Sequence, residues 1–332
     1  MKQSQFTRIL YESPLLRFAK FRAAPTHAGF RDTGPTRQDC FVFPRTTVRI
    51  QHAGGKPFVA GPNLITLYNQ GQVYLRSRVT DEGDRCEFFS VQRSVLVEAL
   101  AAHDPSIQDH PEQPFQLPYA PSDPRTYLLQ RMVVRHVEES EHVDPLFVEE
   151  TVLRVLDRVA ASAARFRGVA QKAAPRSGAG ADEVVDAVRE ILCTRYQEDL
   201  SLADLGHRTG YSVFHLSRVF REKAGLTLHA YQNRMRLLTA LERVAEPGTE
   251  LSEIAHDLGY VSHSHFTAAF RQAFGVTPSA FRAKASAQRV LELAGELNTA
   301  TEPPPPQPPT ALESDPQNPP PRCSEPEAPR AH

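Results

Sequence analysis

The first part of the chain contains short runs in which hydrophobic and polar side chains alternate, separated by turns rich in glycine. Alternation with a period of two is typical of strands that bury one face. Many short strands with glycine turns indicate a small barrel or sandwich, so we expect a β domain over residues 1–120. The predicted strands are Phe41–Gln51, Asn63–Asn69, Gln72–Val79 and Arg85–Val91.

From Asp123 onward the hydrophobic residues follow the spacing of α-helices. Asp123-Pro124 and Asp144-Pro145 mark two helix starts, because Asp caps a helix and Pro fits its first turn. We therefore expect an antiparallel helix pair within residues 121–167, which either covers the β domain or pairs with a second copy. The two hydrophobic stripes are Tyr127, Leu128, Met132 and Val133, and Phe147, Val148, Val152, Leu153, Val155, Leu156 and Val159.

Residues 182–298 are again helical, and they contain one helical unit twice. Leu202–Tyr231 aligns with Leu251–Phe281 when the second copy is given one extra residue. The matched pairs include Gly210 with Gly259, Tyr211 with Tyr260, Leu216 with Phe266, Phe220 with Phe270, and Arg221 with Arg271.

Each copy has the parts of a helix-turn-helix. Short helices at 202–208 and 251–257 are expected to point Leu and Ala inward, and Gly210 and Gly259 permit the left-handed backbone of a sharp turn. Ser212 or Ser262 then caps a second helix, in which the residues between the buried apolar positions face outward. An exposed set of Ser, Thr, His and Arg suits DNA base edges and phosphates. They are Phe214, Ser217, Arg218 and Arg221 in the first copy, and His263, Ser264, Thr267, Ala268 and Arg271 in the second, with His265 beside the buried edge.

A long helix is predicted between the copies, from Thr227 to Pro247. About 18–20 helical residues at ~1.5 Å each span roughly 27–30 Å. This length approaches one turn of DNA, ~34 Å. The connecting helix would therefore hold the two second helices near successive major grooves on one side of the duplex.

The charge of the chain points to DNA only locally. The 332 residues suffice for two domains with their own cores, and the net charge is −1. Between Ser201 and Val290, however, eleven Lys/Arg stand against seven Asp/Glu. This modest excess predicts salt-sensitive DNA binding that dimerisation would strengthen. The cations include Arg208, Arg218, Arg221, Lys223, Arg234, Arg236, Arg271, Arg282 and Lys284.

Metal, cofactor and catalytic sites are not expected. His263 and His265 lie two residues apart, so on a helix their side chains diverge by roughly 200°, whereas chelating pairs lie at i and i+4. The four cysteines lack CxxC spacing and are interpreted as reduced structural thiols, with a thiol sensor using Cys40 and Cys86 as the alternative.

Two segments lack the composition of a folded domain. Residues 168–181 are small and polar with Gly and Pro, which predicts a flexible linker. Residues 299–332 are rich in proline and predict an extended, disordered tail. The sequence has no apolar run of membrane-spanning length and no apolar signal core near Met1, so we expect a cytoplasmic protein that does not contact the membrane.

The motifs SVFHLSRVFREKAGLT, YQNRMRLLTA and IAHDLGYVSHSHFTAAFRQAFGVTPSAFR resemble, in this order, those of the AraC/XylS family of bacterial transcription regulators. The resemblance implies two helix-turn-helix subdomains joined by a long helix, with DNA-reading helices at 213–222 and 262–272. It implies sequence-specific binding to double-stranded operator DNA at promoters, with RNA polymerase as a further candidate partner. Base or backbone contacts are expected from Phe214, Ser217 and Arg218, and from His263, Ser264, His265 and Thr267.

The segments VAGPNLITLYNQGQVYLRS and DRCEFFSV resemble the cupin-like sensory barrel of the same family. Such barrels bind a small-molecule effector, pair subunits into a homodimer, or do both. The expected fold class is therefore α+β, with a cupin-like β-barrel and helix pair followed by an all-α double helix-turn-helix domain. His52 is alone on its strand, without the His, His and Glu cluster of metal-binding cupins. An effector-independent regulator with a dimerisation-only barrel and a barrel enzyme are the alternatives.

Two positions depart from the family pattern. Gly206 occupies a place where Ala is usual, which costs ~1 kcal/mol of helix propensity. Ala268 stands where Arg is common, so the second reading helix is expected to make fewer phosphate or base contacts than the first.

Overall fold

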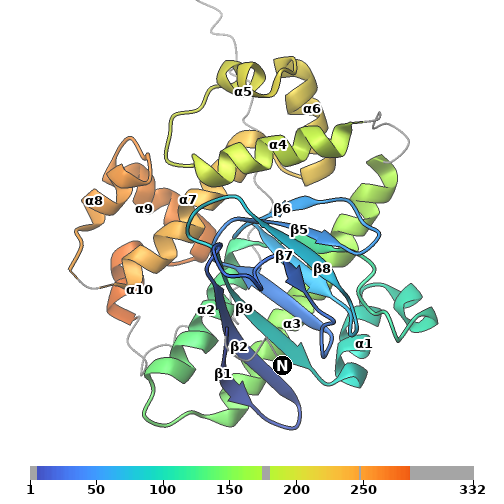
Figure 1. Ribbon diagram of the computed structural model, residues 1–332. Helices are drawn as coiled ribbons and strands as arrows, with labels where there is room; N and C mark the ends of the chain where they lie inside the picture. Colours follow the sequence, from blue (N-terminus) through green and yellow to red (C-terminus); the bar gives the residue numbers. More distant parts are fainter. Residues whose placement is uncertain (1–5, 174–179, 247, 285–332) are drawn as a thin grey trace, which may run out of the picture. The chain divides into compact units, whose positions relative to one another are not determined.

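Two antiparallel β-sheets build the N-terminal region (Figure 1). The computed structural model describes residues 6–173, 180–246 and 248–284. Across the larger sheet the order is β1 (Thr7–Glu12), β2 (Leu16–Ala23), β9 (Asp84–Val91), β4 (Cys40–Pro44), β7 (Leu64–Tyr68) and β10 (Tyr119–Pro121). Across the smaller sheet it is β3 (Asp32–Thr33), β8 (Tyr74–Arg78), β5 (Val48–His52) and β6 (Phe58–Ala60). The expected α+β class is confirmed, but the described strands form two sheets rather than one closed barrel.

The predicted strand Phe41–Gln51 is wrong as a single element. β4 and β5 occupy it, and they belong to different sheets. The chain crosses between the sheets at Arg45–Thr47, just after Pro44, whose backbone has no N–H to donate to a ladder. The Thr46 hydroxyl fixes this crossing by donating to the Gly83 carbonyl and accepting from the Arg85 N–H, at 2.8 and 2.9 Å. The other three predicted strands correspond to β7, β8 and β9.

Alternate side chains of the larger sheet serve two different cores. Phe41, Phe43 and Phe89 lie in the core shared with the helices. Val42 and Cys86 lie in a cluster on the opposite face, toward the smaller sheet. The period-two pattern of the sequence thus places the larger sheet between a helical layer and the smaller sheet. The helix α1 (Arg93–Ala101) and the short 3₁₀ helix η1 (Pro105–Asp109) follow β9.

The predicted helix pair is present as α2 (Pro124–Glu139) and α3 (Pro145–Ala173). Asp123 caps α2 by accepting from the N–H groups of Arg125 and Thr126. Both stripes pack in the core, with Phe147 and Leu153 partly buried and the other stripe residues buried. The helix α3 continues to Ala173, so the first six residues of the predicted linker are helical, and residues 174–179 lie outside the described part.

Seven helices follow in the described residues: α4 (Ala181–Thr194), α5 (Leu202–Thr209), α6 (Val213–Ala224), α7 (Leu228–Ala245), α8 (Leu251–Asp257), α9 (His263–Phe274) and α10 (Pro278–Lys284). They contain both copies of the repeat and the connecting helix α7. Side chains of α4, α5 and α6 and the start of α7 form one core. Side chains of α8 and α9, Phe281 of α10 and the second half of α7 join the core of α2 and α3. The two copies of the repeat are therefore built into different cores.

No helix among the described residues is both long enough and apolar enough to cross a membrane. The predicted proline-rich tail, residues 299–332, and residues 285–298 lie outside the described part of the chain.

Candidate nucleic-acid interface

The first copy of the repeat consists of α5 and α6. Ser201 and Asp204 form a capping box at the start of α5, in which each side chain accepts from the other residue's backbone N–H. Gly210 ends α5 in the left-handed conformation, with φ of 74°. Ser212 then caps α6 by accepting from the His215 N–H. These local signals produce the sharp turn between the two helices.

The second copy consists of α8 and α9 and has the same order of parts. Gly259 takes a φ of 78° in the turn, and Ser262 caps α9 through the His265 N–H. The additional residue of this copy, Val261, is 95% exposed. Because Ser212 and Ser262 cap corresponding helices, the predicted alignment of Leu216 with Phe266 is consistent with the structure.

One detail of the inward faces was predicted wrongly. Leu202 is 46% exposed, and Ala203 is exposed as well, so Leu205 is the buried residue of α5. In the second copy Ile254 and Ala255 are buried, as predicted. The two short helices therefore do not bury equivalent amounts of hydrophobic surface.

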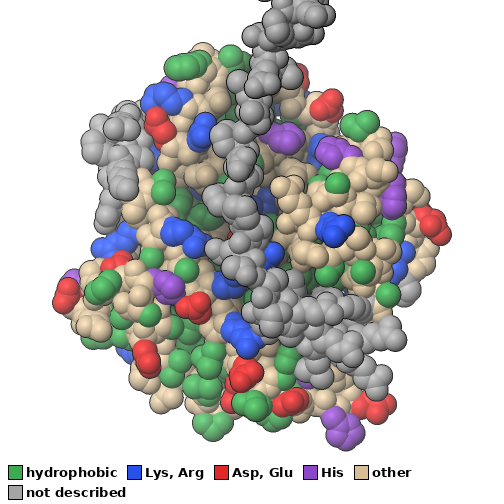
Figure 2. All heavy atoms as spheres, turned by 180° about the vertical axis from the view of Figure 1, so that it is seen from behind, with side chains coloured by type: hydrophobic (Ala, Val, Ile, Leu, Met, Phe, Trp, Pro, Cys, Tyr) green, Lys and Arg blue, Asp and Glu red, His purple; other side chains and the backbone are tan. Residues whose placement is uncertain are grey.

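Nearly all the predicted DNA-contact residues lie on exposed faces. In α6 the side chain of Phe214 is 76% exposed at the first turn. The exposed predicted contacts are Phe214, Ser217, Arg218 and Arg221 in α6, and His263, Ser264, His265 and Arg271 in α9. Figure 2 shows several histidine side chains close together on the side that carries the second copy. The predicted contact faces of α6 and α9 are therefore exposed within the described residues.

Thr267 differs from this set. It is only partly exposed, and its Oγ1 is buried without a hydrogen-bond partner among the described residues. An unpaired buried hydroxyl is unfavourable, so this side chain would gain from a donor or acceptor brought by a bound molecule. Its neighbour Ala268 is exposed and carries no charge.

The cations of this region divide into two groups that the sequence did not distinguish. Arg208, Arg218, Arg221 and Arg271 are exposed. Arg234 and Arg282 instead donate to the backbone carbonyls of Ser122 and Val244. Burial lowers the pKa of the Arg234 guanidinium. The predicted DNA-facing charge was therefore overcounted, because several of the counted cations stabilise the fold.

Arg236 has a positioning role that the sequence did not reveal. From α7 its Nε donates to the Tyr196 carbonyl at 2.6 Å, and its Nη2 to the Glu198 carbonyl at 3.0 Å. Its Nη1 donates to the Gly259 carbonyl at 2.9 Å, in the turn of the second copy. One guanidinium thus ties the loop before the first copy to the turn of the second.

A tyrosine in each turn contacts the histidine at the third position of the following helix. The rings of Tyr211 and His215 are stacked with centroids 5.7 Å apart. The rings of Tyr260 and His265 meet edge to face at 5.5 Å. Tyr260 is fixed by donating to Asn233 at 2.8 Å, so His265 is the better positioned of the two imidazoles. The Gly-Tyr dipeptide before each cap was the sequence signal for these contacts.

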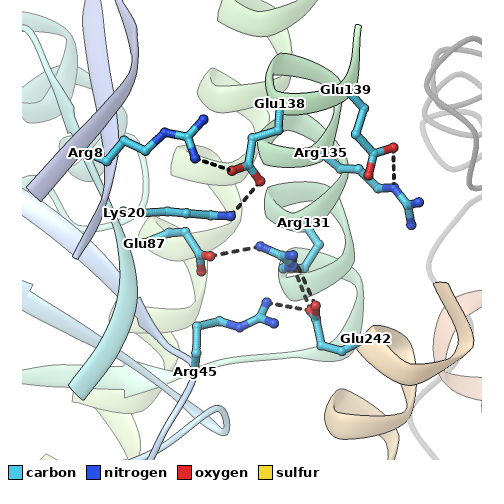
Figure 3. A network of polar contacts seen from close by, with 9 residues as sticks. All are labelled: Arg8, Lys20, Arg45, Glu87, Arg131, Arg135, Glu138, Glu139 and Glu242. Carbon is cyan, nitrogen blue, oxygen red and sulfur yellow. Dashed lines mark hydrogen bonds and ion pairs between the residues drawn. The ribbon is translucent and has the colours of Figure 1, made fainter. Parts of the chain in front are cut away.

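A largely buried network of ion pairs joins the connecting helix α7 to the sheets and to α2 (Figure 3). The Glu242 carboxylate of α7 binds Arg131 of α2 in a bidentate arrangement, with Nε and Nη2 of the arginine 2.7 and 3.1 Å from the carboxylate oxygens. It also accepts from Arg45 Nη1 at 2.5 Å. Arg131 also donates to Glu87 of β9 at 2.9 Å. Burial raises the pKa of Glu242, but the two guanidiniums more than offset this effect and bring it to about 2. Glu242 is therefore a fixed negative charge at neutral pH.

The helix α4 is joined to the smaller sheet in a similar way. The Asp186 carboxylate accepts from the Val59 N–H of β6 at 2.5 Å and from Arg49 of β5. Arg49 also pairs with Glu190. The helices α4 and α7, which share cores with the two copies of the repeat, are thus connected to the β region by charged contacts.

The structure contains a second candidate site, a cavity of about 230 Å³ lined by residues of both sheets. Its apolar wall includes Phe21, Val42, Ile50 and Phe88. Its polar wall includes Arg17, Tyr68, Tyr74, Arg76 and Asp84. A concave space with apolar walls and a few polar groups is typical of small-molecule sites.

Cys40 and Cys86 also line this cavity. Burial raises the pKa of the Cys40 thiol to about 12 and that of Cys86 well above its usual value. Because the thiolate is the reactive form, neither cysteine has the properties of the thiol sensor considered above. His52 is buried and neutral, since burial lowers its pKa to about 4. Among the described residues no group of three or more His, Cys, Asp or Glu is arranged to hold a metal ion.

Comparison with known proteins agrees with this geometry. A family model described as a helix-turn-helix domain matches residues 205–284. The chain is 34% identical over 104 residues to the "Probable transcription factor PqrA" of Proteus vulgaris, a match that covers 31% of this chain and 85% of that protein. It is 32% identical over 100 residues to the "Regulatory protein SoxS" of Salmonella typhimurium, covering 30% of this chain and 94% of that protein.

The solved structures are less similar as whole molecules. The structure of ToxT from Vibrio cholerae matches 81% of this chain and 98% of its own, with 12% identity and a TM-score of 0.30. A DNA-binding transcriptional dual regulator from Escherichia coli K-12 matches 32% of this chain and 94% of its own, with 24% identity and a TM-score of 0.30.

The duplicated helix-turn-helix with two open polar faces defines a DNA-binding transcription regulator. By its sequence relatives, the chain belongs to the AraC/XylS family.

Proposed function

We propose that this regulator reads a promoter operator with α6 and α9 and that a small molecule in the cavity between its two sheets controls the reading. One observation supports both parts. The two reading helices have exposed faces and pack with α4 and α7. Ion pairs join α4 and α7 to the sheets that surround the cavity. A ligand that shifts the sheets would therefore act on the elements that hold the reading helices.

The two reading helices are proposed to contribute unequally. In α6, Phe214 offers an apolar surface of the kind that contacts a thymine methyl, and Arg218 can pair with a guanine or a phosphate. In α9, His263, Ser264 and His265 offer hydrogen bonds, and Ala268 replaces the Arg that α6 has at the same position. Arg221 and Arg271 end the two faces as phosphate contacts. The first copy should therefore contribute more of the affinity.

A gel-shift and footprinting series with the full chain on the promoters next to its own gene tests the DNA part of the proposal. Protection of a site at low salt, lost as salt rises, is the expected result, because phosphate contacts release counterions. Failure to protect any site at low salt would reject it. The full chain is required because the core of the second copy includes α2 and α3.

The control part is tested separately by thermal unfolding across a metabolite library. A compound that binds only the folded protein raises the midpoint. Under the alternative of an effector-independent regulator whose sheets only pair subunits, no compound would raise the midpoint.

Homodimerisation, contact with RNA polymerase and a cytoplasmic location remain predictions. The relatives are named as regulators, and we propose no catalytic activity.

A further inference from the structure

Asp84, the first residue of β9, places a buried carboxylate at the wall of the cavity between the sheets. Its Oδ2 lies 2.7 Å from Arg76 Nε, which is the one side-chain contact of Asp84 within the described residues. The two groups attract as charges, but they are not aligned as a hydrogen bond. An ionised carboxylate can accept about four hydrogen bonds. Asp84 therefore has unused acceptor capacity on the wall of the cavity.

The Arg76 guanidinium is surrounded by other groups of the protein. Its Nη2 lies 3.2 Å from the Tyr74 hydroxyl, and its Nη1 lies 3.4 Å from the Phe30 carbonyl. The rings of Phe21, Phe30 and Tyr74 surround the guanidinium, with centroids 4.6, 5.3 and 5.7 Å away. Its Nε faces Asp84. An acidic ligand placed beside Arg76 would therefore also lie close to the Asp84 carboxylate, which would repel it.

Burial raises the pKa of Asp84 even though the nearby Arg76 acts to lower it. The carboxylate is thus poorly solvated for a charged group, and a hydrogen bond from a ligand would stabilise its ionised form. The remaining walls are largely apolar, as noted for Phe21, Val42, Ile50 and Phe88. An apolar cavity of ~150 Å³ holds benzene. The present volume of about 230 Å³ suits a ring with one or two small substituents.

We propose that this cavity binds a small, single-ring compound whose hydroxyl or amino group donates a hydrogen bond to Asp84, and that it disfavours a carboxylate at that position. The inference rests on the proposed effector function and names the chemistry of the effector. Arg17 and Arg37 also line the cavity, and Arg17 Nε is buried without a hydrogen-bond partner among the described residues. The competing outcome of the test is therefore that one of these arginines binds a carboxylate of the ligand.

The chain contains no tryptophan, which permits a direct test. Phe88 lines the cavity and is partly exposed, so Phe88→Trp provides a single fluorescent reporter in the wall. The variant would be titrated with 4-methylphenol, 4-methylbenzylamine, 4-methylbenzoate and toluene, which share one ring and differ in polar group. We expect the phenol or the amine to bind at least 10-fold more tightly than toluene and the benzoate.

Thermal unfolding of the unaltered chain with the same four compounds should give the same order. Two variants locate the interaction: Asp84→Asn should remove the preference for the donor compounds, and Val42→Phe should weaken all four by filling the cavity. Since Asp84→Asn leaves Arg76 unpaired and can unfold the protein, the series on the unaltered chain is the decisive measurement. Tighter binding of the benzoate, equal binding of all four, or no binding at millimolar concentration would overturn the proposal. None of these outcomes bears on DNA binding, which the gel shift measures independently.

Discussion

Arg218 and Ala268 hold equivalent positions in the two reading helices, and this difference makes the copies chemically unequal. Arg218 is exposed and pairs with Glu222 one turn later, at 3.1 Å. Ion pairs of this exposed kind contribute little to stability. The guanidinium can therefore exchange its carboxylate partner for a phosphate or a guanine at small cost.

Replacing Arg218 with Ala should weaken operator binding by about 10-fold or more, because a good base contact contributes ~1–3 kcal/mol of discrimination. The unfolding midpoint should stay nearly unchanged. Gel-shift titration measures the first quantity and thermal unfolding the second.

The matched control is Arg195→Ala. Arg195 is also exposed and pairs with Glu198 at 3.2 Å, but it lies at the end of α4 and belongs to neither reading helix. Equal loss of affinity in both variants would show that net charge, and not the position of Arg218, determines binding.

Gly206 illustrates how a residue can be misjudged from propensity. A Cβ added there would lie 3.0 Å from the Tyr211 carbonyl oxygen and 3.4 Å from Val213 Cγ1. Both contacts belong to the turn that leads into α6. The glycine is thus explained by the close approach of the turn, which the sequence did not show.

We expect Gly206→Ala to give no gain in stability, although propensity alone predicts a gain of ~1 kcal/mol. Denaturant unfolding measures the change. The control is Ala203→Gly, at an exposed position of the same helix. It changes helix propensity alone and should lower the free energy of unfolding by up to ~1 kcal/mol. A stabilisation by Gly206→Ala as large as the loss in the control would contradict the role of the turn contact.

At the scale of elements, helical periodicity and capping residues predicted the repeat well. Both Ser caps, both left-handed glycines and the long connecting helix are found. These features are local, so the chain segment that forms them also carries their signal. The strand Phe41–Gln51 failed for the opposite reason. The division between β4 and β5 depends on which sheet each half joins, and that is decided by distant strands.

The two turn glycines have the same conformation but different surroundings. At Gly210 an added Cβ would meet nothing within 4 Å. At Gly259 it would lie 2.2 Å from the Gln197 carbonyl oxygen and 2.9 Å from Arg236 Nη2. The turn of the second copy is pressed against the loop before α5, and the turn of the first copy is free.

Gly210→Ala should therefore cost only the strain of the left-handed backbone, ~1–2 kcal/mol. Gly259→Ala should add a steric cost of ~1–3 kcal/mol, because a backbone oxygen has to move. Each variant serves as the control for the other, and thermal unfolding compares them. Equal costs would mean that Gly259 is not held against the Gln197 carbonyl.

At the scale of the whole molecule, the contacts between the β region and the DNA-reading helices were not predictable. Glu242 and Arg131 are 111 residues apart in the chain, and Asp186 and Arg49 are 137 apart. The sequence shows these residues as ordinary surface charges. Their pairing follows from how α4 and α7 pack on the sheets and on α2. The pattern of hydrophobic and polar residues along the sequence does not show this packing.

Glu242→Gln should destabilise the protein at neutral pH. The pKa of Glu242 is about 2 in the folded chain, against ~4.3 for an unperturbed Glu, and this difference corresponds to about 3 kcal/mol. Because the folded pKa is the lower one, the contribution is complete above about pH 4.3 and is lost as the pH falls toward 2. The unfolding free energies of the two proteins should therefore converge over this interval.

Glu246→Gln is the control for that experiment. Glu246 follows the same helix and is exposed, so its replacement should change stability little at any pH. A difference between Glu242→Gln and the unaltered chain that stays constant from pH 7 to pH 2 would contradict the ion-pair assignment.

The shared core of α2, α3, α7 and α9 has a consequence for the exchange of parts between regulators. A fusion that takes only the last third of the chain would remove α2 and leave apolar surface of the second copy facing water. A functional hybrid would need to bring α2 along or to exchange that face for polar residues. The first copy, which has a core of its own with α4, should transplant more readily because it brings its packing partner with it.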